Sequence, residues 1–390
     1  MSKIDQTLAA AMPAGPQARI PLVAYILTGA VAVIGANSLV LAPIAPEVAR
    51  TLGVSVQIVM VASAAFGLGT AASALFLARF IDRFGAWRLM RLAFATLALA
   101  LAASAVAPTA TLLAVAQLVA GLAAGVALPA IYSGAALVAP AGRENETVGI
   151  VLVGWTLSMV AGVSLSAVLA DILNWRAVYG CVSVLAAAAV IALTVSNRRD
   201  VTSASVVVQP FAALSIPGVV PLLAACGAFM AAFYGTYGYI GDHATSGLGR
   251  PVSYNGLLAV LYGLGFGSAV FLDRLMQRFE PRLLLPLVFL GVACIYAILA
   301  GLAWSFAAIA FCVFLWGLAN HLGLNLLIVR LTAIDPSRRG AIMGLNSAIT
   351  YLAAFAGTLA FGPVYAEYGF AAVSVSAGAL VVFAALAARG

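Results

Sequence analysis

The most unusual polar side chains of this sequence lie in the middle of an apolar run over residues 305–330. Asn320 and His321 are adjacent there, and Asn325 follows the histidine by four positions. Residues i and i+4 share a helix face, so His321 and Asn325 should point the same way. Imidazole titrates near neutral pH, and an amide both donates and accepts hydrogen bonds. This face could bind a polar solute or relay a proton, and the alternative is a hydrogen-bonded histidine in helix packing.

Further polar and aromatic side chains interrupt the other apolar runs. Amides suit a neutral polar solute but also join helices by hydrogen bonds. Trp155 could stack on a ring-bearing solute or pack against lipid, and Tyr234 and Tyr237 could line the cavity or belong to an interfacial belt. We place Tyr239 and His243, near the end of their run, at the membrane interface. The expected solute-contacting residues are Asn37, Gln117, Trp155, Tyr234, Tyr237, His321, Asn325 and Asn346.

The amino-acid composition indicates whether water or lipid surrounds these apolar runs. Hydrophobic residues make up 64% of the 390 positions and charged residues only 8%, whereas soluble proteins carry roughly 25% charged residues. Because so few charges cannot cover a water-exposed surface, we expect a multi-pass membrane protein. The four cysteines lie in apolar runs without CxxC spacing, which predicts small buried side chains rather than disulfides or a metal site.

Twelve apolar stretches follow a polar amino-terminal tail, and each approaches the roughly 20 residues that a bilayer-spanning helix requires. We expect both termini on the same side of the membrane, because the number of spans is even. The expected spans are 20–45, 54–78, 90–107, 110–137, 147–170, 176–196, 219–240, 254–272, 283–301, 305–330, 341–364 and 370–388.

The basic residues predict the orientation of the chain. If the amino terminus is inside, every Lys and Arg except Arg50, Arg176 and Arg250 falls on the cytoplasmic side. The positive-inside rule therefore predicts both termini in the cytoplasm, and we expect the membrane to be a bacterial inner membrane. The net charge of +7 reflects this topology, so we expect the lipid bilayer and no nucleic acid as a partner.

The longest cytoplasmic connection, residues 197–218, divides the spans into two groups of six. We therefore predict an amino-terminal bundle over 1–196 and a carboxy-terminal bundle over 219–390. Internal similarity favours this division, because Gly162 recurs 195 positions later as Gly357 within similar surroundings. Parallel repeats of this kind are typical of transporters whose site lies near the midplane between the halves.

The segment 78–88 reads Ala-Arg-Phe-Ile-Asp-Arg-Phe-Gly-Ala-Trp-Arg between the second and third spans. It resembles the Gly-x-x-x-Asp-Arg-x-Gly-x-Arg loop of the major facilitator superfamily, and the resemblance extends over nearly the whole chain. Within that family the chain looks most like the twelve-span drug and sugar efflux permeases of the arabinose-efflux-like branch. The stretches Pro46–Ala49 and Asn174–Arg176 support this placement. The resemblance implies an all-α membrane protein with two pseudo-symmetric six-helix bundles.

Three positions depart from the pattern of these relatives. Asn37 stands where many carry an acid in the first span, and Gln117 replaces the arginine of the fourth span. The fifth-span Gly-x-Pro-x-Gly is Gly-Val-Ser-Leu-Ser over residues 162–166. The departures leave the fold intact and remove the usual acid and arginine for proton coupling.

The resemblance also implies a gate. In the family, charges matching Asp82, Arg83 and Arg88 make contacts between helices that hold the cytoplasmic side shut when the cavity opens outward. Asp273 and Arg274 follow the eighth span as Asp82 and Arg83 follow the second, so we expect them to act alike. The alternative is a set of loop charges without a specific role.

These observations favour a secondary transporter. The sequence holds no HExxH, GxSxG or GxxxxGK[ST] pattern, so neither an enzyme nor an ATP-driven pump is expected. We expect a monomer without cofactors or metals that exports a drug, sugar or related metabolite by alternating access, with protons as the coupling ion. The alternative is a uniporter or importer of a small polar metabolite without coupling through a buried acid.

Overall fold

The computed structural model describes residues 19–77, 80–141, 143–196, 200, 210–276 and 278–389. The side chains of Asp82, Asn145, Pro210, Asp273 and Arg274 lie outside this description. The described residues form helices joined by short turns, with no strand among them. Eleven of these helices are long and apolar enough to cross a membrane.

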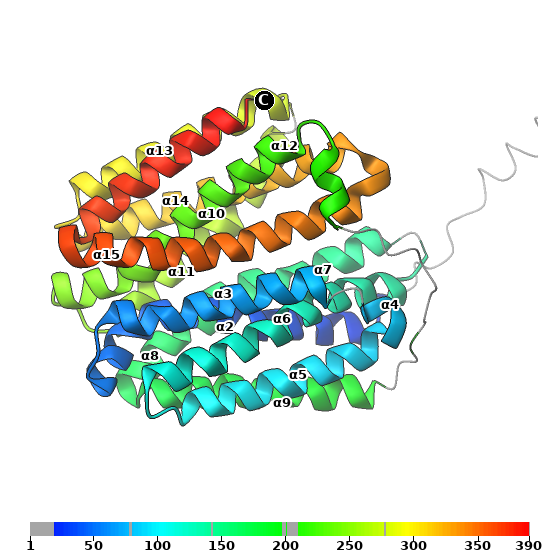
Figure 1. The fold of residues 1–390 in the computed structure, drawn as a ribbon, viewed down its shortest axis with the longest axis horizontal. Coiled ribbons are helices and arrows are strands. Elements are labelled where there is room, and N and C mark those ends of the chain that lie inside the picture. The colour runs from blue at the N-terminus through cyan, green and yellow to red at the C-terminus, as the bar shows by residue number, and fades with distance from the viewer. Residues whose placement is uncertain are drawn as a thin grey trace, which may run out of the picture.

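The first six spans form one layer of the molecule, the lower one in Figure 1. The fifth span is one continuous rod made of α7, η1 and α8. The helices of this amino-terminal half are α2 (Leu22–Leu52), α3 (Val56–Phe76), α4 (Phe80–Phe84), α5 (Ala86–Ala105), α6 (Ala110–Val138), α7 (Glu144–Leu157), η1 (Ser158–Val163), α8 (Ser164–Ile172) and α9 (Trp175–Val195).

The remaining helices form the second layer, the upper one in Figure 1. The halves meet where α2 packs on α10, α3 on α15, and α8 on α11. The helices of this carboxy-terminal half are η2 (Pro210–Ser215), α10 (Val219–Asp242), η3 (His243–Gly247), α11 (Ser253–Ser268), α12 (Val270–Met276), α13 (Pro281–Gly301), α14 (Phe306–Ile334), η4 (Pro336–Arg338) and α15 (Arg339–Ala387).

Helix α15 contains two spans. Its 49 residues would extend about 74 Å as a straight helix, more than twice the roughly 30 Å hydrocarbon core. Gly369 breaks it with a φ of 76°, a left-handed conformation that glycine adopts without the clash of a Cβ atom. The chain folds back there (Figure 1), so α15 raises the spanning segments to twelve. The predicted all-α membrane fold with two six-helix bundles is confirmed.

We name the two ends of the molecule by their connections. The linker end is the end at which α9 stops and η2 begins, and the far end is opposite. Polar N-caps mark helix starts at the far end, where the side chains of Ser55, Thr109, Asn174 and Ser305 each accept a hydrogen bond from a backbone N–H three residues later. Such caps satisfy the unpaired amides of a helix start.

The first span is longer than the sequence predicted. It was expected to end at residue 45, but α2 continues past Pro43 and Pro46 to Leu52. The helix ends at Gly53, whose φ of 66° is left-handed and whose N–H donates to the carbonyl of Ala49. Proline removes a helix hydrogen bond without necessarily ending a span, because neighbouring helices can satisfy the freed carbonyls.

Glycines set the closest helix crossings in both halves. A Cβ atom on Gly121 of α6 would overlap the carbonyl oxygen of Phe66 in α3, and one on Gly317 of α14 would overlap that of Tyr262 in α11. Both residues of the second pair lie 196 positions after those of the first. The two halves therefore share the same backbone-to-backbone crossing, as small residues allow in membrane helices.

Candidate functional site

The polar cluster of α14 lies against α11. The Asn320 amide is buried, and its Nδ2 donates to the Tyr262 hydroxyl at 2.9 Å. The His321 ring is partly exposed and stands edge-on to Phe266, with ring centroids 4.9 Å apart. Asn325 is also partly exposed one turn further on. The expected imidazole and amide therefore lie beside each other near the middle of α14, with the imidazole supported by an aromatic residue of α11.

Aromatic side chains fill the centre of the carboxy-terminal half. The ring of Phe233 lies 5.5 Å from Tyr237 and 5.3 Å from Trp316, and Tyr262 lies 5.3 Å from Trp316, all between centroids. Tyr237 belongs to this cluster. The Tyr234 ring also contacts Phe233, at 5.0 Å between centroids, while its hydroxyl reaches Ser38 of α2. Both tyrosines expected to contact solute thus border the cluster, and Tyr234 also contacts the other half.

The first-span and fourth-span amides bind each other. Asn37 Nδ2 donates to Gln117 Oε1 at 3.1 Å, and Gln117 Nε2 donates to the Ser104 hydroxyl at 3.1 Å. All three side chains are buried. Asn37 and Gln117 occupy the positions at which many of the efflux permeases that this chain resembles carry an acid and an arginine. A neutral amide chain joins three helices here, and only Asn37 Oδ1 lacks a partner among the described residues.

The remaining expected contact residues line other parts of the interior. The Trp155 indole N–H donates to the Tyr132 hydroxyl at 3.0 Å, and its ring packs close to Gly35 of α2. Asn346 in α15 is buried, and its Oδ1 has no partner among the described residues. Unpaired buried amide oxygens are costly, so Asn37 and Asn346 remain candidates for solute contact.

The expected gate residues lie at the linker end. Arg83 and Arg88 are exposed, and the Arg83 guanidinium lies over the Phe84 ring at 5.4 Å from its centroid. The Asp82, Asp273 and Arg274 side chains lie outside the described residues. The gating roles of all five residues therefore stay a prediction.

An unforeseen contact at this end involves Asp200 in the connection between the halves. Its Oδ1 accepts the backbone N–H groups of Trp87 at 2.8 Å and Arg88 at 3.3 Å. These are unpaired amides of the first turn of α5, which lacks a side-chain cap of its own because Gly85 precedes it with a φ of 89°. A carboxylate at a helix start is stabilised by the amides and by the helix dipole. Asp200 thus links the connection between the halves, through hydrogen bonds, to the loop that resembles the family motif.

Asp200→Ala is expected to lower the free energy of unfolding by about 1 kcal/mol, the usual value of a side-chain cap. Gly85→Ala should be more damaging in the wild type than in Asp200→Ala, because its Cβ atom would overlap the Asp200 carboxyl group and Cβ atom, and only the overlap with the Cβ atom remains in Asp200→Ala. Thermal unfolding of the two single variants and the double variant in detergent gives the coupling between the sites. Additive effects would show that the contact does not form.

One buried acid, Asp242 at the far end of α10, was not among the residues expected from the sequence. It is the one buried carboxylate among the side chains that the structure describes. Tyr365 of α15 donates to its Oδ2 at 2.7 Å, and Ser246 donates to its Oδ1 at 2.7 Å. The Tyr365 ring in turn stacks on Tyr239 at 5.0 Å between centroids. Acidic side chains are rare within membrane-spanning helices, so this carboxylate is a candidate functional group.

Asp242 also lines a cavity of about 580 Å³ between the two halves at the far end. Glu47 and Asp171 of the amino-terminal half line the same cavity, and Glu47 is paired with Arg50 at 2.8 Å. His243 stacks on Phe370 and lies 2.7 Å from the Ala303 carbonyl through Nε2, and its place at the membrane interface stays a prediction. The far end therefore gathers titratable groups from both halves.

The sequence of residues 27–358 matches the family model of the Major Facilitator Superfamily. The chain belongs to the major facilitator superfamily. The chain is 25% identical over 372 residues to the uncharacterized MFS-type transporter YwfA of Bacillus subtilis (strain 168), covering 93% of this chain and 90% of that protein. It is 28% identical over 285 residues to a chloramphenicol resistance protein of Streptomyces lividans, covering 70% and 72% of the two chains.

The fold of this major facilitator protein is similar to solved transporters. One is a bacterial homolog of the human lysosomal transporter Spinster in an inward-facing and unoccupied conformation, with a TM-score of 0.76, 16% identity and coverage of 97% and 98%. This likeness concerns the fold, which agrees with two six-helix bundles. It also shows that the departures at Asn37 and Gln117 are compatible with the family fold.

Proposed function

We propose that this protein exports a small molecule across the bacterial inner membrane by alternating access, in exchange for protons. Membership of the major facilitator superfamily supports solute transport, and the similarity to a chloramphenicol resistance protein supports export. The basic residues support a cytoplasmic linker end, which makes the far end periplasmic. Rocking of the two halves would then move access to a fixed site between them.

The observation that carries proton coupling is the buried carboxylate of Asp242. With Asn37 and Gln117 neutral, the amino-terminal half lacks the acid and arginine of its relatives. Asp242 lies beside a cavity between the halves and holds two hydroxyl donors, Tyr365 and Ser246. Uptake of a periplasmic proton there would neutralise the charge of this buried side chain. Because burying a charge costs more than burying a neutral polar group, protonation would favour closure of the far end after the solute has left.

Transport in proteoliposomes tests this function. Purified protein is reconstituted with its linker end outward, and labelled chloramphenicol is offered outside with the lumen either acidic or at equal pH. An exporter coupled to protons accumulates the solute only when the lumen is acidic. Accumulation to the outside concentration without a pH difference, and no more with it, would instead identify the uncoupled uniporter. A thermal-shift screen with sugars, nucleosides and antibiotics extends the test to other solutes.

His321→Ala is expected to reduce transport at least tenfold while the protein keeps its thermal stability. The imidazole is partly exposed and contacts the Phe266 ring, so its removal should disturb the site more than the helix packing. His321→Gln separates two roles, because an amide can replace hydrogen bonds but not proton transfer. Unchanged transport in His321→Ala would remove this residue from the site.

A further inference from the structure

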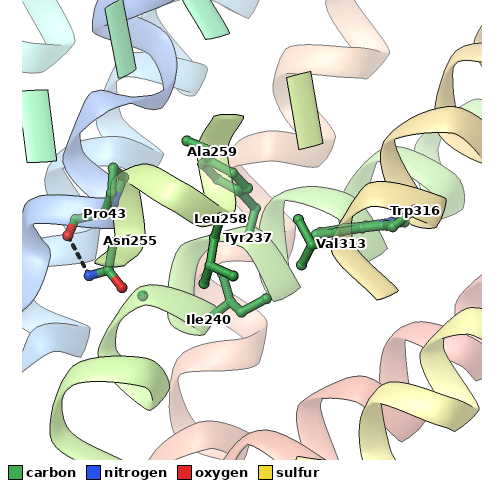
Figure 2. A pocket seen from close by; sticks show the side chains of 9 residues that line it. Pro43, Tyr237, Ile240, Asn255, Leu258, Ala259, Val313 and Trp316 are labelled. Carbon is green, nitrogen blue, oxygen red and sulfur yellow. Dashed lines mark hydrogen bonds between the residues drawn. The ribbon is translucent and has the colours of Figure 1, made fainter. Parts of the chain in front are cut away.

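A small closed pocket lies in the carboxy-terminal half near the far end (Figure 2). It lies between α10, α11 and α14, and Tyr237, Asn255 and Trp316 contribute to its wall. Pro43 of α2 is the one lining residue from the other half. The enclosed space is about 10 Å³, on the order of a single water molecule. In this conformation the pocket is therefore too small for a solute.

Pro43 forms the part of the pocket wall that belongs to the amino-terminal half. Asn255 Nδ2 donates to the Pro43 carbonyl at 2.8 Å and to the Thr245 hydroxyl at 3.1 Å. A Cβ atom on Gly241 would lie 3.0 Å from the Ala42 carbonyl oxygen and 3.3 Å from the Pro43 Cα, so the α2 and α10 backbones nearly touch. Any opening of the far end that separates the halves must break the contact of Asn255 with Pro43 and uncover the pocket.

Three polar atoms of the pocket-lining residues have no hydrogen-bond partner among the described residues. They are the amide oxygen of Asn255, the hydroxyl of Tyr237 and the indole nitrogen of Trp316. Asn255 is 2% exposed and Tyr237 is 7% exposed. Figure 2 shows the Asn255 nitrogen turned to Pro43, with the amide oxygen on the other side. An unpaired buried polar group is unfavourable and requires an explanation, such as a bound molecule in another conformation.

We propose that this pocket is a solute subsite that opens to the far side when Pro43 withdraws, and that it takes an uncharged aromatic molecule carrying a hydroxyl or amide. No charged side chain lines it. The rings of Tyr237 and Trp316 offer flat apolar surface, Asn255 Oδ1 accepts from a donor on the solute, and the Tyr237 hydroxyl bonds a second polar group. The proposal rests on the proposed function, since it names the solute class and the last contact before release.

A large side chain placed between the two halves at the far end, here called a wedge, makes the subsite testable. Gly256 of α11 lies opposite α8, and a Cβ atom there would lie 2.7 Å from the backbone oxygen of Ser164. Gly256→Trp should therefore hold the halves apart at the far end, without changing a residue that lines the pocket. Gly256→Leu repeats the test with a smaller wedge if the tryptophan variant does not fold.

Chloramphenicol is the probe, and its Kd is measured by calorimetry on the wedged protein in lipid nanodiscs. Asn255→Ala and Tyr237→Phe, each added to Gly256→Trp, are expected to weaken binding about tenfold, the value of one hydrogen bond near 1.4 kcal/mol. Tyr368→Phe is the matched control, because this tyrosine is 67% exposed and distant from the pocket lining. The protein that carries Gly256→Trp and Tyr368→Phe should bind chloramphenicol with the same Kd as the Gly256→Trp protein.

Binding that Asn255→Ala leaves unchanged would overturn the subsite, as would absence of chloramphenicol binding to the wedged protein. Either result leaves the proposed function to the proteoliposome experiment, which uses the wild-type protein. Conversely, specific loss of binding in Asn255→Ala supports the subsite even if the wild-type protein transports without a proton gradient. The two proposals can therefore fail separately.

Discussion

Asp242→Asn is expected to abolish accumulation of solute driven by a pH gradient, down to the level seen at equal pH. The asparagine keeps the shape of the side chain and can still accept hydrogen bonds from Tyr365 and Ser246. It cannot bind and release a proton. Exchange of labelled for unlabelled solute without net transport should continue in the same proteoliposomes, because that exchange does not require coupling.

Asp171→Asn provides the matched control for this experiment. Asp171 lines the same far-end cavity, but its side chain is exposed. Its charge is therefore solvated in every conformation, and its loss should leave accumulation within about twofold of the wild type. Full accumulation in Asp242→Asn, or equal losses in both variants, would show that the buried carboxylate does not couple transport to protons.

Gly317→Ala is expected to cost on the order of 3 kcal/mol of stability, the upper part of the range for overpacked cores. The added Cβ atom overlaps the Tyr262 backbone oxygen, and backbone cannot move aside as the end of a flexible side chain can. Helices α11 and α14 would have to separate, which would also displace Asn320 from Tyr262. Thermal unfolding in detergent and the yield of monodisperse protein measure this loss.

Gly291→Ala is the control for helix propensity. Gly291 is an exposed position within α13, and nothing lies within 4 Å of a Cβ atom there. Alanine is favoured over glycine within a helix by about 0.5–1 kcal/mol, so this variant should be slightly more stable than the wild type. A Gly317→Ala protein as stable as Gly291→Ala would mean that the two helices do not cross as closely as described.

Most of the fold could be predicted from the sequence because bilayer thickness fixes the length of each apolar run. The residues at which the spans end could be predicted less closely. The first span was expected to end at residue 45, yet α2 continues past Pro43 and Pro46 to Leu52. Asn255 is the partner for Pro43, and no local pattern in the sequence links residues so far apart.

The candidate site could be predicted only in part. The mid-span position of His321 and Asn325 follows from spacing alone, whereas the bond between Asn37 and Gln117 joins positions 80 residues apart. Asp242 was passed over because it follows a tyrosine-rich run near a span end, where acids are ordinarily solvated. Its burial depends on Tyr365, which comes 123 residues later. Such burial is a property of the assembled bundle and leaves no local signal.

A single buried carboxylate in the described part of the chain has a thermodynamic consequence for the organism. If each cycle returns one proton through Asp242, this stoichiometry limits the concentration ratio of solute that the exporter can maintain across the membrane. One elementary charge moving across 100 mV releases about 2.3 kcal/mol, which supports a concentration ratio of roughly 50-fold for a neutral solute. Such a pump would protect a cell against moderate doses of a toxin and would be overwhelmed by doses well above that ratio.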